Sequence, residues 1–413
     1  MTRVGFACCV ALAGLAGCGP GADDVERALT GSGEVRPFTI AVPDSVLTDL
    51  RARLSRVRLP DQIPGTAWAY GTNRAYLEEL LAYWLDDFDW RAQERRLNGF
   101  DHFRTAIDGV DVHFVHQRSE HPDAIPLLVI HGWPGSFVEF AGVVGPLTDP
   151  TGHGGEPEDA FHVVAPSLPG FGFSGKPAEP GWSPERMADL LAALMERLGY
   201  DRYGVQGGDW GGIIGRSLAG NYPEHVTGLH SNFILGGPAP GTDPNEGMTP
   251  DEIELRRERV EAFAEGSGYQ EIQGTKPQTL GYGLNDSPAG LAAWIVEKFH
   301  GWSDHSGDVG EAFTKDEILT NITLYWVTET ITSSTRIYYE SRHAAATRPV
   351  QYVEVPTAGA IFPKEIYFTP RAWAEARYNI VRWTEMPRGG HFAALEEPEL
   401  LVDDIRAFYR ELR

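Results

Sequence analysis

A glycine-rich turn between an apolar strand and a helix is the strongest structural signal in this chain. Residues 207–212 read Gly-Gly-Asp-Trp-Gly-Gly, an apolar run ends before them near Val205, and residues 213–219 have the pattern of a helix. At a sharp strand–turn–helix junction the tip residue has a strained backbone, and its neighbours must be small to clear the strand and the helix. Asp209 occupies the tip, so the pattern predicts a nucleophile elbow with a carboxylate at its centre.

The carboxylate of Asp209 allows two interpretations. As a nucleophile, it attacks a carbon electrophile and forms an alkyl ester that water must hydrolyse, which favours epoxides or alkyl halides over ordinary esters and peptides. Aspartate is also a favoured residue at helix N-caps, so a structural capping role is the alternative.

Composition narrows the classes of function. The formal net charge is −23, from 35 basic and 58 acidic residues, which argues against a nucleic-acid partner because such proteins need clustered Lys and Arg. The only three cysteines are Cys8, Cys9 and Cys18. The rest of the chain therefore has no disulfide, no thiolate nucleophile and no cysteine-based metal site.

The first residues have the pattern of a targeting segment. Arg3 precedes an apolar run over residues 4–16, and the run ends in Leu-Ala-Gly-Cys at residues 15–18. This shape is typical of a secretory signal, and its last four residues resemble the lipobox of bacterial lipoproteins. We expect a lipoprotein-type signal over residues 1–18, a lipid anchor at Cys18, a flexible tether over residues 19–33, and an exported, membrane-anchored protein. The alternative is a mis-assigned start and a cytoplasmic protein.

Hydrophobic periodicity divides the remainder. Residues 34–100 are helical and aromatic and are interpreted as an N-terminal meander. Residues 101–235 alternate strands and helices, with strands expected over 111–116, 126–131, 161–166 and 226–234 and a helix over 184–198. This alternation predicts an α/β fold with a mostly parallel sheet flanked by helices. Residues 236–348 form a helical cap insertion, and residues 349–413 complete the core with strands over 353–359 and 380–384 and a helix over 398–412.

A histidine and an acid follow Asp209 in the order that the α/β-hydrolase fold uses for a triad. His391 lies on a glycine-flanked loop past the last expected strand, and Glu365 follows the strand before it. Residues 131–136 read His-Gly-Trp-Pro-Gly-Ser after a central strand. We expect backbone N–H groups of Trp133 and Trp210 to form an oxyanion hole.

Opening an epoxide also requires a donor for the ring oxygen, and tyrosine is a suitable acid. Any one tyrosine in the expected cap is more often a packing residue than a catalytic one. The candidates are Tyr269, Tyr282, Tyr325, Tyr338 and Tyr339.

Taken together, these motifs resemble the microsomal epoxide hydrolase family, and the resemblance extends over residues 34–413. Its motifs are at residues 131–136, 207–211, 275–279, 284–293 and 388–394. The resemblance implies the α/β-hydrolase fold, Asp209 as nucleophile, His391 and Glu365 as the charge pair, and Tyr269 and Tyr338 as ring-opening tyrosines. Because Tyr339 adjoins Tyr338, the register of the second tyrosine is left open. The family needs neither a cofactor nor a metal, and some members carry an N-terminal membrane helix that is longer than the apolar run here.

The motifs are compatible with three functions. The first is hydrolysis of a small hydrophobic epoxide by water to a vicinal diol. The second is a haloalkane dehalogenase with the same nucleophile, in which Trp210 holds the halide. The third is a non-catalytic lipoprotein that binds a hydrophobic ligand, which an intact triad argues against. The sequence leaves the oligomeric state open.

Overall fold

The structure is a computed structural model that describes residues 33–238, 241–344 and 348–413. The expected signal segment, Cys18 and all but the last residue of the expected tether lie outside the described residues.

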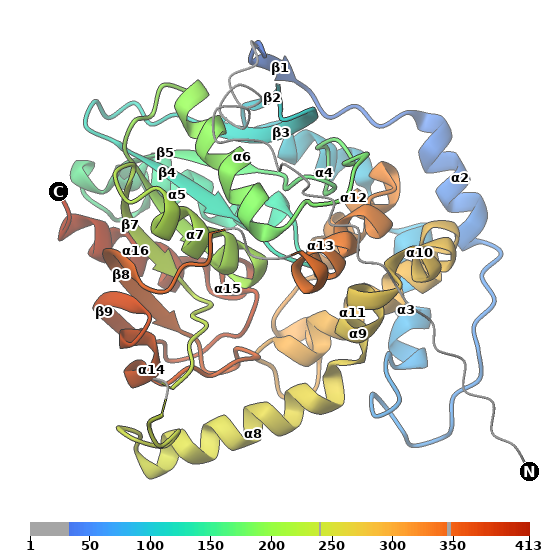
Figure 1. The fold of residues 1–413 in the computed structure, drawn as a ribbon. Helices are drawn as coiled ribbons and strands as arrows, with labels where there is room; N and C mark the ends of the chain where they lie inside the picture. Colours follow the sequence, from blue (N-terminus) through green and yellow to red (C-terminus); the bar gives the residue numbers. More distant parts are fainter. Residues whose placement is uncertain (1–32, 239–240, 345–347) are drawn as a thin grey trace, which may run out of the picture.

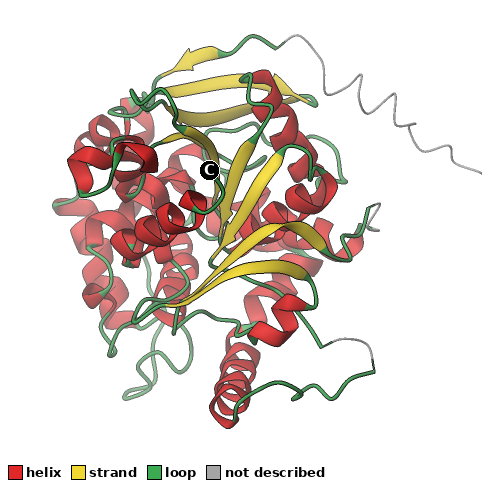
Figure 2. Ribbon diagram, turned by 90° about the vertical axis from the view of Figure 1, so that its left-hand side faces the viewer, coloured by secondary structure: helices red, strands yellow, loops and turns green. Residues whose placement is uncertain are grey.

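A twisted sheet runs through the centre of the molecule (Figures 1 and 2). The described residues form nine strands in the order β1-β2-β3-β5-β4-β6-β7-β8-β9. The first three neighbouring pairs are antiparallel and the others are parallel, as expected for this fold class. The strands are β1 (Arg36–Phe38), β2 (His102–Ile107), β3 (Val110–Gln117), β4 (Ile125–Ile130), β5 (Phe161–Pro166), β6 (Tyr203–Gly207), β7 (Val226–Ser231), β8 (Val353–Ile361) and β9 (Tyr378–Glu385).

Helices cover both faces of the sheet. A Cβ atom on Gly204 in β6 would lie 2.5 Å from the ring of Tyr409 in α16 (Pro398–Arg410), whereas a Cβ atom on Gly215 in α7 (Asp209–Asn221) would lie 3.2 Å from Val205. Successive residues of a strand point to opposite faces, so α16 and α7 lie on opposite sides. The remaining helices of the core are α5 (Val144–Thr148), α6 (Pro184–Arg197), α14 (Arg371–Glu375) and α15 (Ala393–Glu396).

Among the described residues, six α-helices form an insertion between β7 and β8, on the right-hand side and along the bottom of Figure 1. The residues of the long α8 are exposed or half-buried, and none is buried. By contrast, α11 and α12 bury most of their side chains. The helices are α8 (Pro250–Gly266), α9 (Gly268–Thr275), α10 (Pro277–Asp286), α11 (Pro288–Trp302), α12 (Lys315–Thr328) and α13 (Ile331–His343). We refer to them together as the insertion.

The N-terminal segment packs against the insertion as well as the sheet. Its helices are α2 (Asp44–Leu54), α3 (Arg74–Asp86) and α4 (Trp90–Leu97). The hydroxyl of Tyr83 in α3 donates to Asp316 in α12 at 3.0 Å, and Thr72 donates to the carbonyl of Ala293 in α11 at 2.6 Å. Short 3-10 helices complete the described elements at Phe137–Gly142, Pro150–His153, Pro157–Asp159 and Val309–Glu311. No helix in the described ranges is both long and apolar enough to span a bilayer.

Three local expectations differ from the structure. The N-terminal segment was expected to be helical throughout, but β1 pairs with β2, a three-residue contact too short to show a periodicity. The strand expected over 226–234 ends at Ser231, because Ser231 is paired with Gly207, the last residue of β6 before the turn. The helix expected from residue 213 begins earlier, at Asp209 itself.

Candidate active site

The nucleophile elbow has the strain that its sequence predicts. Asp209 has φ of 49°, in the left-handed region that a residue with a Cβ atom rarely occupies. A Cβ atom on Gly211 would lie 1.9 Å from the carbonyl oxygen of Ile130 in β4, and one on Gly207 would lie 2.4 Å from the Gly211 backbone. The N-cap of α7 is Gly208, and no side chain caps this end of the helix. The capping interpretation of Asp209 is therefore wrong, and its carboxylate is free for other contacts.

Both oxygens of that carboxylate face candidate partners. Oδ1 accepts a hydrogen bond from the backbone N–H of Trp133 at 2.7 Å, and Oδ2 lies 3.5 Å from Nε2 of His391. A Cβ atom on Gly132 would lie 2.2 Å from Oδ1, so only glycine leaves the carboxylate its place. Trp210 is the second residue of α7, where backbone N–H groups have no partner within the helix. The expected oxyanion donors thus flank Asp209, with Trp133 on the loop after β4 and Trp210 in the first turn of α7.

His391 is held between two carboxylates. Its Nδ1 lies 2.6 Å from Oε1 of Glu365, and the same oxygen accepts the backbone N–H of Ile366. The backbone N–H of His391 donates to the carbonyl of Trp302 at 2.9 Å. Burial alone lowers the pKa of His391, but the negative charges of Glu365 and Asp209 outweigh it, and the pKa is raised well above its usual value. His391 is therefore a base whose protonated form is stabilised by Glu365 and Asp209.

The tyrosine candidates separate clearly. Tyr269 from α9 and Tyr338 from α13 are buried with ring centroids 5.6 Å apart, and Tyr269 stacks on Trp133 at 5.4 Å. Burial is the main cause that raises the pKa of both phenols. The hydroxyl of Tyr338 is buried and has no hydrogen-bond partner among the described residues.

The other three candidates are placed elsewhere. Tyr282 is 73% exposed, and Tyr339 is 36% exposed and stacks on His343. Tyr325 is buried, but its hydroxyl donates to the carbonyl of Gly135 at 2.7 Å. Of the neighbours Tyr338 and Tyr339, only Tyr338 faces the group of Trp133, Tyr269 and Trp210.

The loop of Trp133 is fixed by the insertion. The Trp133–Pro134 peptide bond is cis. From α12, Asn321 donates to the carbonyl of Pro134 at 2.8 Å and accepts from the hydroxyl of Ser136 at 2.8 Å. Nothing in the local sequence pattern around Asn321 marks it as a partner of a loop 185 residues away.

A second residue that sequence reasoning missed is Glu139. Its carboxylate and Ser136 form a capping box, a signal readable as Ser-x-x-Glu. Glu139 lines a chamber of about 20 Å³ together with Asp209 and His391. Burial is the main cause that raises the pKa of Glu139, to about 8.

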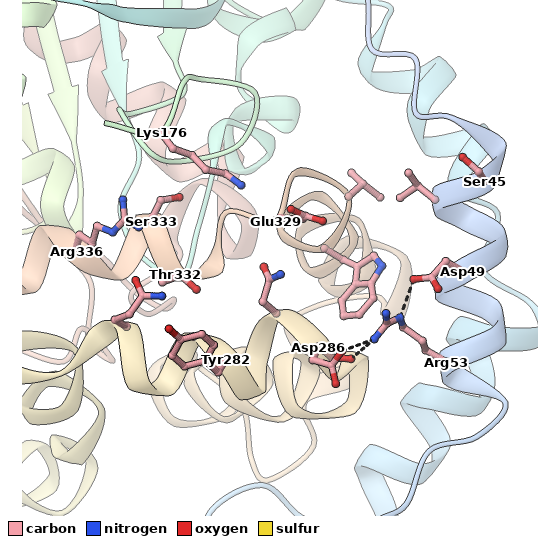
Figure 3. Close-up of a pocket in the computed structure, with 16 residues that line it drawn as sticks. Ser45, Asp49, Arg53, Lys176, Tyr282, Asp286, Glu329, Thr332, Ser333 and Arg336 are labelled. Atoms are coloured by element: carbon pink, nitrogen blue, oxygen red, sulfur yellow. Dashed lines mark hydrogen bonds and ion pairs between the residues drawn. The ribbon is translucent and has the colours of Figure 1, made fainter. Parts of the chain in front are cut away.

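A larger cavity lies apart from this chemistry. It measures about 580 Å³ and is lined by residues of α2, α10, α12 and α13 (Figure 3). Its wall carries an ion pair between Arg53 and Asp286 and the exposed Tyr282, and it includes none of the site residues expected from the sequence. We therefore locate the candidate site by its chemistry, at the carboxyl ends of the parallel strands.

Comparisons with known proteins agree with this architecture. The family described as "Epoxide hydrolase N terminus" matches residues 35–140, and "alpha/beta hydrolase fold" matches residues 125–258. The chain is 46% identical over 380 residues to a protein of Stigmatella aurantiaca (strain DW4/3-1), covering 92% of this chain and 86% of that protein. It is 40% identical over 408 residues to epoxide hydrolase 1 of Sus scrofa, covering 91% and 88%.

Solved structures give the same result. The juvenile hormone epoxide hydrolase of Bombyx mori superposes with a TM-score of 0.85 at 33% identity, covering 94% of this chain and 97% of that one. The epoxide hydrolase of Aspergillus niger superposes with a TM-score of 0.82 at 34% identity, covering 92% and 97%. The α/β-hydrolase fold expected from the sequence is confirmed. The chain belongs to the microsomal-type epoxide hydrolase family and is an epoxide hydrolase.

Proposed function

We propose that this epoxide hydrolase converts a small hydrophobic epoxide to a vicinal diol through an alkyl ester on Asp209. The observation that carries the proposal is the placement of the Asp209 carboxylate, with Oδ1 on the Trp133 N–H and Oδ2 toward His391. Trp133 also packs against Tyr269 and Tyr338, which brings two phenols to the same place.

In the first half-reaction, Oδ2 attacks the less hindered ring carbon while Trp133 holds Oδ1. The carbon–oxygen bond of the ring breaks, and its electron pair goes to the ring oxygen. That oxygen takes a proton from the pair Tyr269 and Tyr338. Because burial raises the pKa of both phenols, they stay protonated and act as donors at neutral pH.

In the second half-reaction, His391 takes a proton from water through Nε2, and the water oxygen adds to Cγ of the ester. The backbone N–H groups of Trp133 and Trp210 bind the oxyanion that forms on Oδ1. The bond between Cγ and Oδ2 then breaks, the diol leaves with Oδ2 and the second water hydrogen, and the proton on His391 returns to the phenolate. Glu365 stabilises the imidazolium between these steps.

The dehalogenase alternative has one observation in its favour. The indole nitrogens of Trp133 and Trp210 are both buried without a hydrogen-bond partner in the described part of the chain, and an indole N–H suits a halide ion. The phenol pair beside Trp133 favours the epoxide, because a departing halide needs no proton. Both substrates therefore belong in the test.

The test is a single turnover of styrene oxide in ¹⁸O-labelled water. The ester mechanism predicts an unlabelled diol and ¹⁸O in the Asp209 peptide, because the diol takes its new oxygen from the carboxylate. A labelled diol with unlabelled Asp209 would show direct attack by water and contradict the proposal. Bromoalkane is the parallel substrate, and bromide release without diol formation from styrene oxide would reassign the protein to the dehalogenases.

We also propose that the protein is exported and anchored by lipid at Cys18, on the evidence of the Leu-Ala-Gly-Cys sequence at residues 15–18. Fatty-acid labelling of the expressed chain tests this proposal. We expect label in the membrane fraction and its loss in Cys18→Ala. An unlabelled cytoplasmic protein would contradict it.

A further inference from the structure

A small chamber lies beside Asp209, and polar groups surround it. The chamber of about 20 Å³ is large enough for one water molecule, which needs roughly 10–15 Å³ and two to four polar partners. Asp209, His391, Glu139, Gln206 and Asn232 contribute to its wall. The two residues that perform hydrolysis in the proposed mechanism thus share one water-sized space with the polar side chains of Glu139, Gln206 and Asn232.

Two of these three side chains, Gln206 and Glu139, keep an acceptor oxygen that has no hydrogen-bond partner among the described residues. Gln206 donates to Oδ1 of Asn232 at 3.0 Å, and its own Oε1 is buried with no partner among the described residues. Glu139 uses Oε1 to accept the backbone N–H of Ser136 at 3.1 Å. No hydrogen bond within the described residues is assigned to Oε2 of Glu139. The wall therefore suits a water molecule that donates hydrogen bonds.

The loop is shaped to admit the Glu139 carboxylate. A Cβ atom on Gly135 would lie 1.3 Å from Oε1 of Glu139, so glycine is needed there, just as Gly132 is needed beside Oδ1 of Asp209. The four-residue stretch from Gly132 to Gly135 therefore leaves space for two carboxylates, one of which is the proposed nucleophile. A capping box at an exposed turn would need no such clearance, whereas Glu139 is partly buried and lines the same chamber as Asp209.

We propose that Glu139 is a positioning residue for ester hydrolysis: it accepts a hydrogen bond from the water in the chamber and turns the water oxygen toward Cγ of Asp209. The second hydrogen of that water points to Nε2 of His391, which removes it. This inference rests on the ester mechanism proposed above and adds a residue to its second half-reaction.

Electrostatics make Glu139 sensitive to the state of the nucleophile. Asp209, His391 and the hydroxyl of Tyr325 are the titratable groups that act on it or respond to it. Besides burial, the negative charge of Asp209 raises the pKa of Glu139, and protonated His391 lowers it. Ester formation removes the charge on Asp209, which lowers the pKa of Glu139, so a larger fraction of Glu139 is the ionised carboxylate, which can only accept hydrogen bonds, when hydrolysis has to occur.

The two half-reactions are measured separately to test this role. Rapid mixing of excess enzyme with styrene oxide, followed by intact-protein mass spectrometry, gives the rates at which the ester forms and disappears. Glu139→Gln keeps an oxygen for the Ser136 N–H but places a neutral amide at the chamber. We expect ester formation within about threefold of the wild type and ester hydrolysis slower by about 10- to 100-fold, as for a misplaced reactant. In the steady state, kcat and KM should then fall together.

Glu94→Gln is the matched control, because Glu94 is a buried glutamate that accepts a backbone N–H from Val42 but lies in α4 of the N-terminal segment. We expect it to leave both rates unchanged. If Glu139→Gln does not fold by circular dichroism, Glu139→Asp keeps the charge and the capping position but draws the carboxylate back, and it should slow hydrolysis alone.

Each outcome has one meaning. Equal slowing of both half-reactions by the Glu139 variants, or no slowing of hydrolysis, would overturn the role of Glu139. Absence of the ester in the wild-type enzyme would instead refute the proposed mechanism, which the wild-type trace reports independently of any Glu139 variant.

Discussion

At the scale of single residues, the site depends on carboxylates held in places that ordinary side chains would block. Asp209 is strained at φ 49°, and Gly132 leaves room for its Oδ1. Glu365 holds His391 at 2.6 Å, and it contributes most to the raised pKa of the imidazole. The protonation states of these groups are therefore coupled through short distances in a buried place, where charges interact strongly.

Replacement of Glu365 by glutamine should change both the rate and the pH dependence of ester hydrolysis. Loss of the negative charge lowers the pKa of His391, so the acid limb of the hydrolysis profile should move to lower pH. The rate at the plateau should fall by about 100-fold or more, because the amide neither stabilises imidazolium nor fixes the tautomer. Single-turnover rates over a pH series measure both effects. Glu375→Gln, at an exposed ion pair with Arg371, should alter neither.

The stability of the protein should also report on Glu139. Its pKa is about 8 in the folded protein, above the ordinary value of 4.5, so the folded state binds more protons than the unfolded state between these values. The contribution of Glu139 to stability therefore falls as pH rises, by up to about 1.4 kcal/mol per pH unit. Glu139→Gln lacks this dependence. Its free energy of unfolding relative to wild type should rise between pH 5 and 8, and a difference that stays flat would contradict the raised pKa.

At the scale of elements, the elbow works because β4, β6 and α7 meet more closely than side chains permit. The Cβ position of Gly211 falls 1.9 Å from a backbone oxygen of β4, and backbone cannot swing aside as a flexible side chain can. The close contact between α7 and β4 fixes the end of β6 beside the loop that carries Trp133. In the same way, α12 fixes that loop through Asn321 and Tyr325.

A methyl group added at Gly211 should be far more harmful than one added to an exposed helix. We expect Gly211→Ala to lower the free energy of unfolding by about 3 kcal/mol or more, because the strand and helix must separate. Gly283→Ala is the matched control: it lies within α10 with nothing within 4 Å of its Cβ position, and it should gain about 0.5–1 kcal/mol. Urea unfolding of both variants measures the difference. Equal stabilities would show that the elbow relaxes without cost.

At the scale of the whole molecule, the proposed mechanism draws on two parts of the chain, the sheet and the insertion. The sheet supplies Asp209, His391 and Glu365 at its carboxyl edge, and the insertion supplies Tyr269 and Tyr338. Loops link the parts directly, since the N–H of His391 is bound to the carbonyl of Trp302 and Gly389 to Asp304 at 2.9 Å. Movement of the insertion would therefore disturb the base and the phenols at once.

Removal of the phenol hydroxyls should slow ring opening without cost to stability. Tyr269→Phe and Tyr338→Phe should each reduce the rate of ester formation by about 10- to 100-fold, and the double variant by about 10³-fold or more, since an acid catalyst is lost. The Tyr338 hydroxyl lies beside the polar groups of Tyr269 and Trp210 but forms no hydrogen bond of standard geometry among the described residues, so its removal should cost little stability. Tyr339→Phe, one residue along α13 and half-exposed, is the control that should leave the rate unchanged. Ester formation at the wild-type rate in the double variant would exclude the phenols as donors.

The sequence alone determined the elbow, the order of strands and helices, and the identity of the nucleophile, histidine and acid candidates. These features depend on short stretches of chain. The turn leaves no room for a Cβ atom at Gly207 or Gly211, so both positions require glycine. Buried parallel strands appear in the sequence as apolar runs. Within each motif the residues are neighbours along the chain, so a local pattern carries the information, whereas the choice of Glu365 among nearby acids depended more on the family resemblance.

Only the tertiary structure decided which tyrosines face Asp209, that Asn321 and Tyr325 hold the loop of Trp133, and that Glu139 shares a chamber with the nucleophile. Tyr338 and Tyr339 are adjacent in sequence, yet the packing of α13 turns one inward and the other to solvent. The contacts of Asn321 and Tyr325 with the loop join residues 185 to 190 positions apart. No periodicity encodes such pairs, because the docking of the insertion on the sheet brings them together.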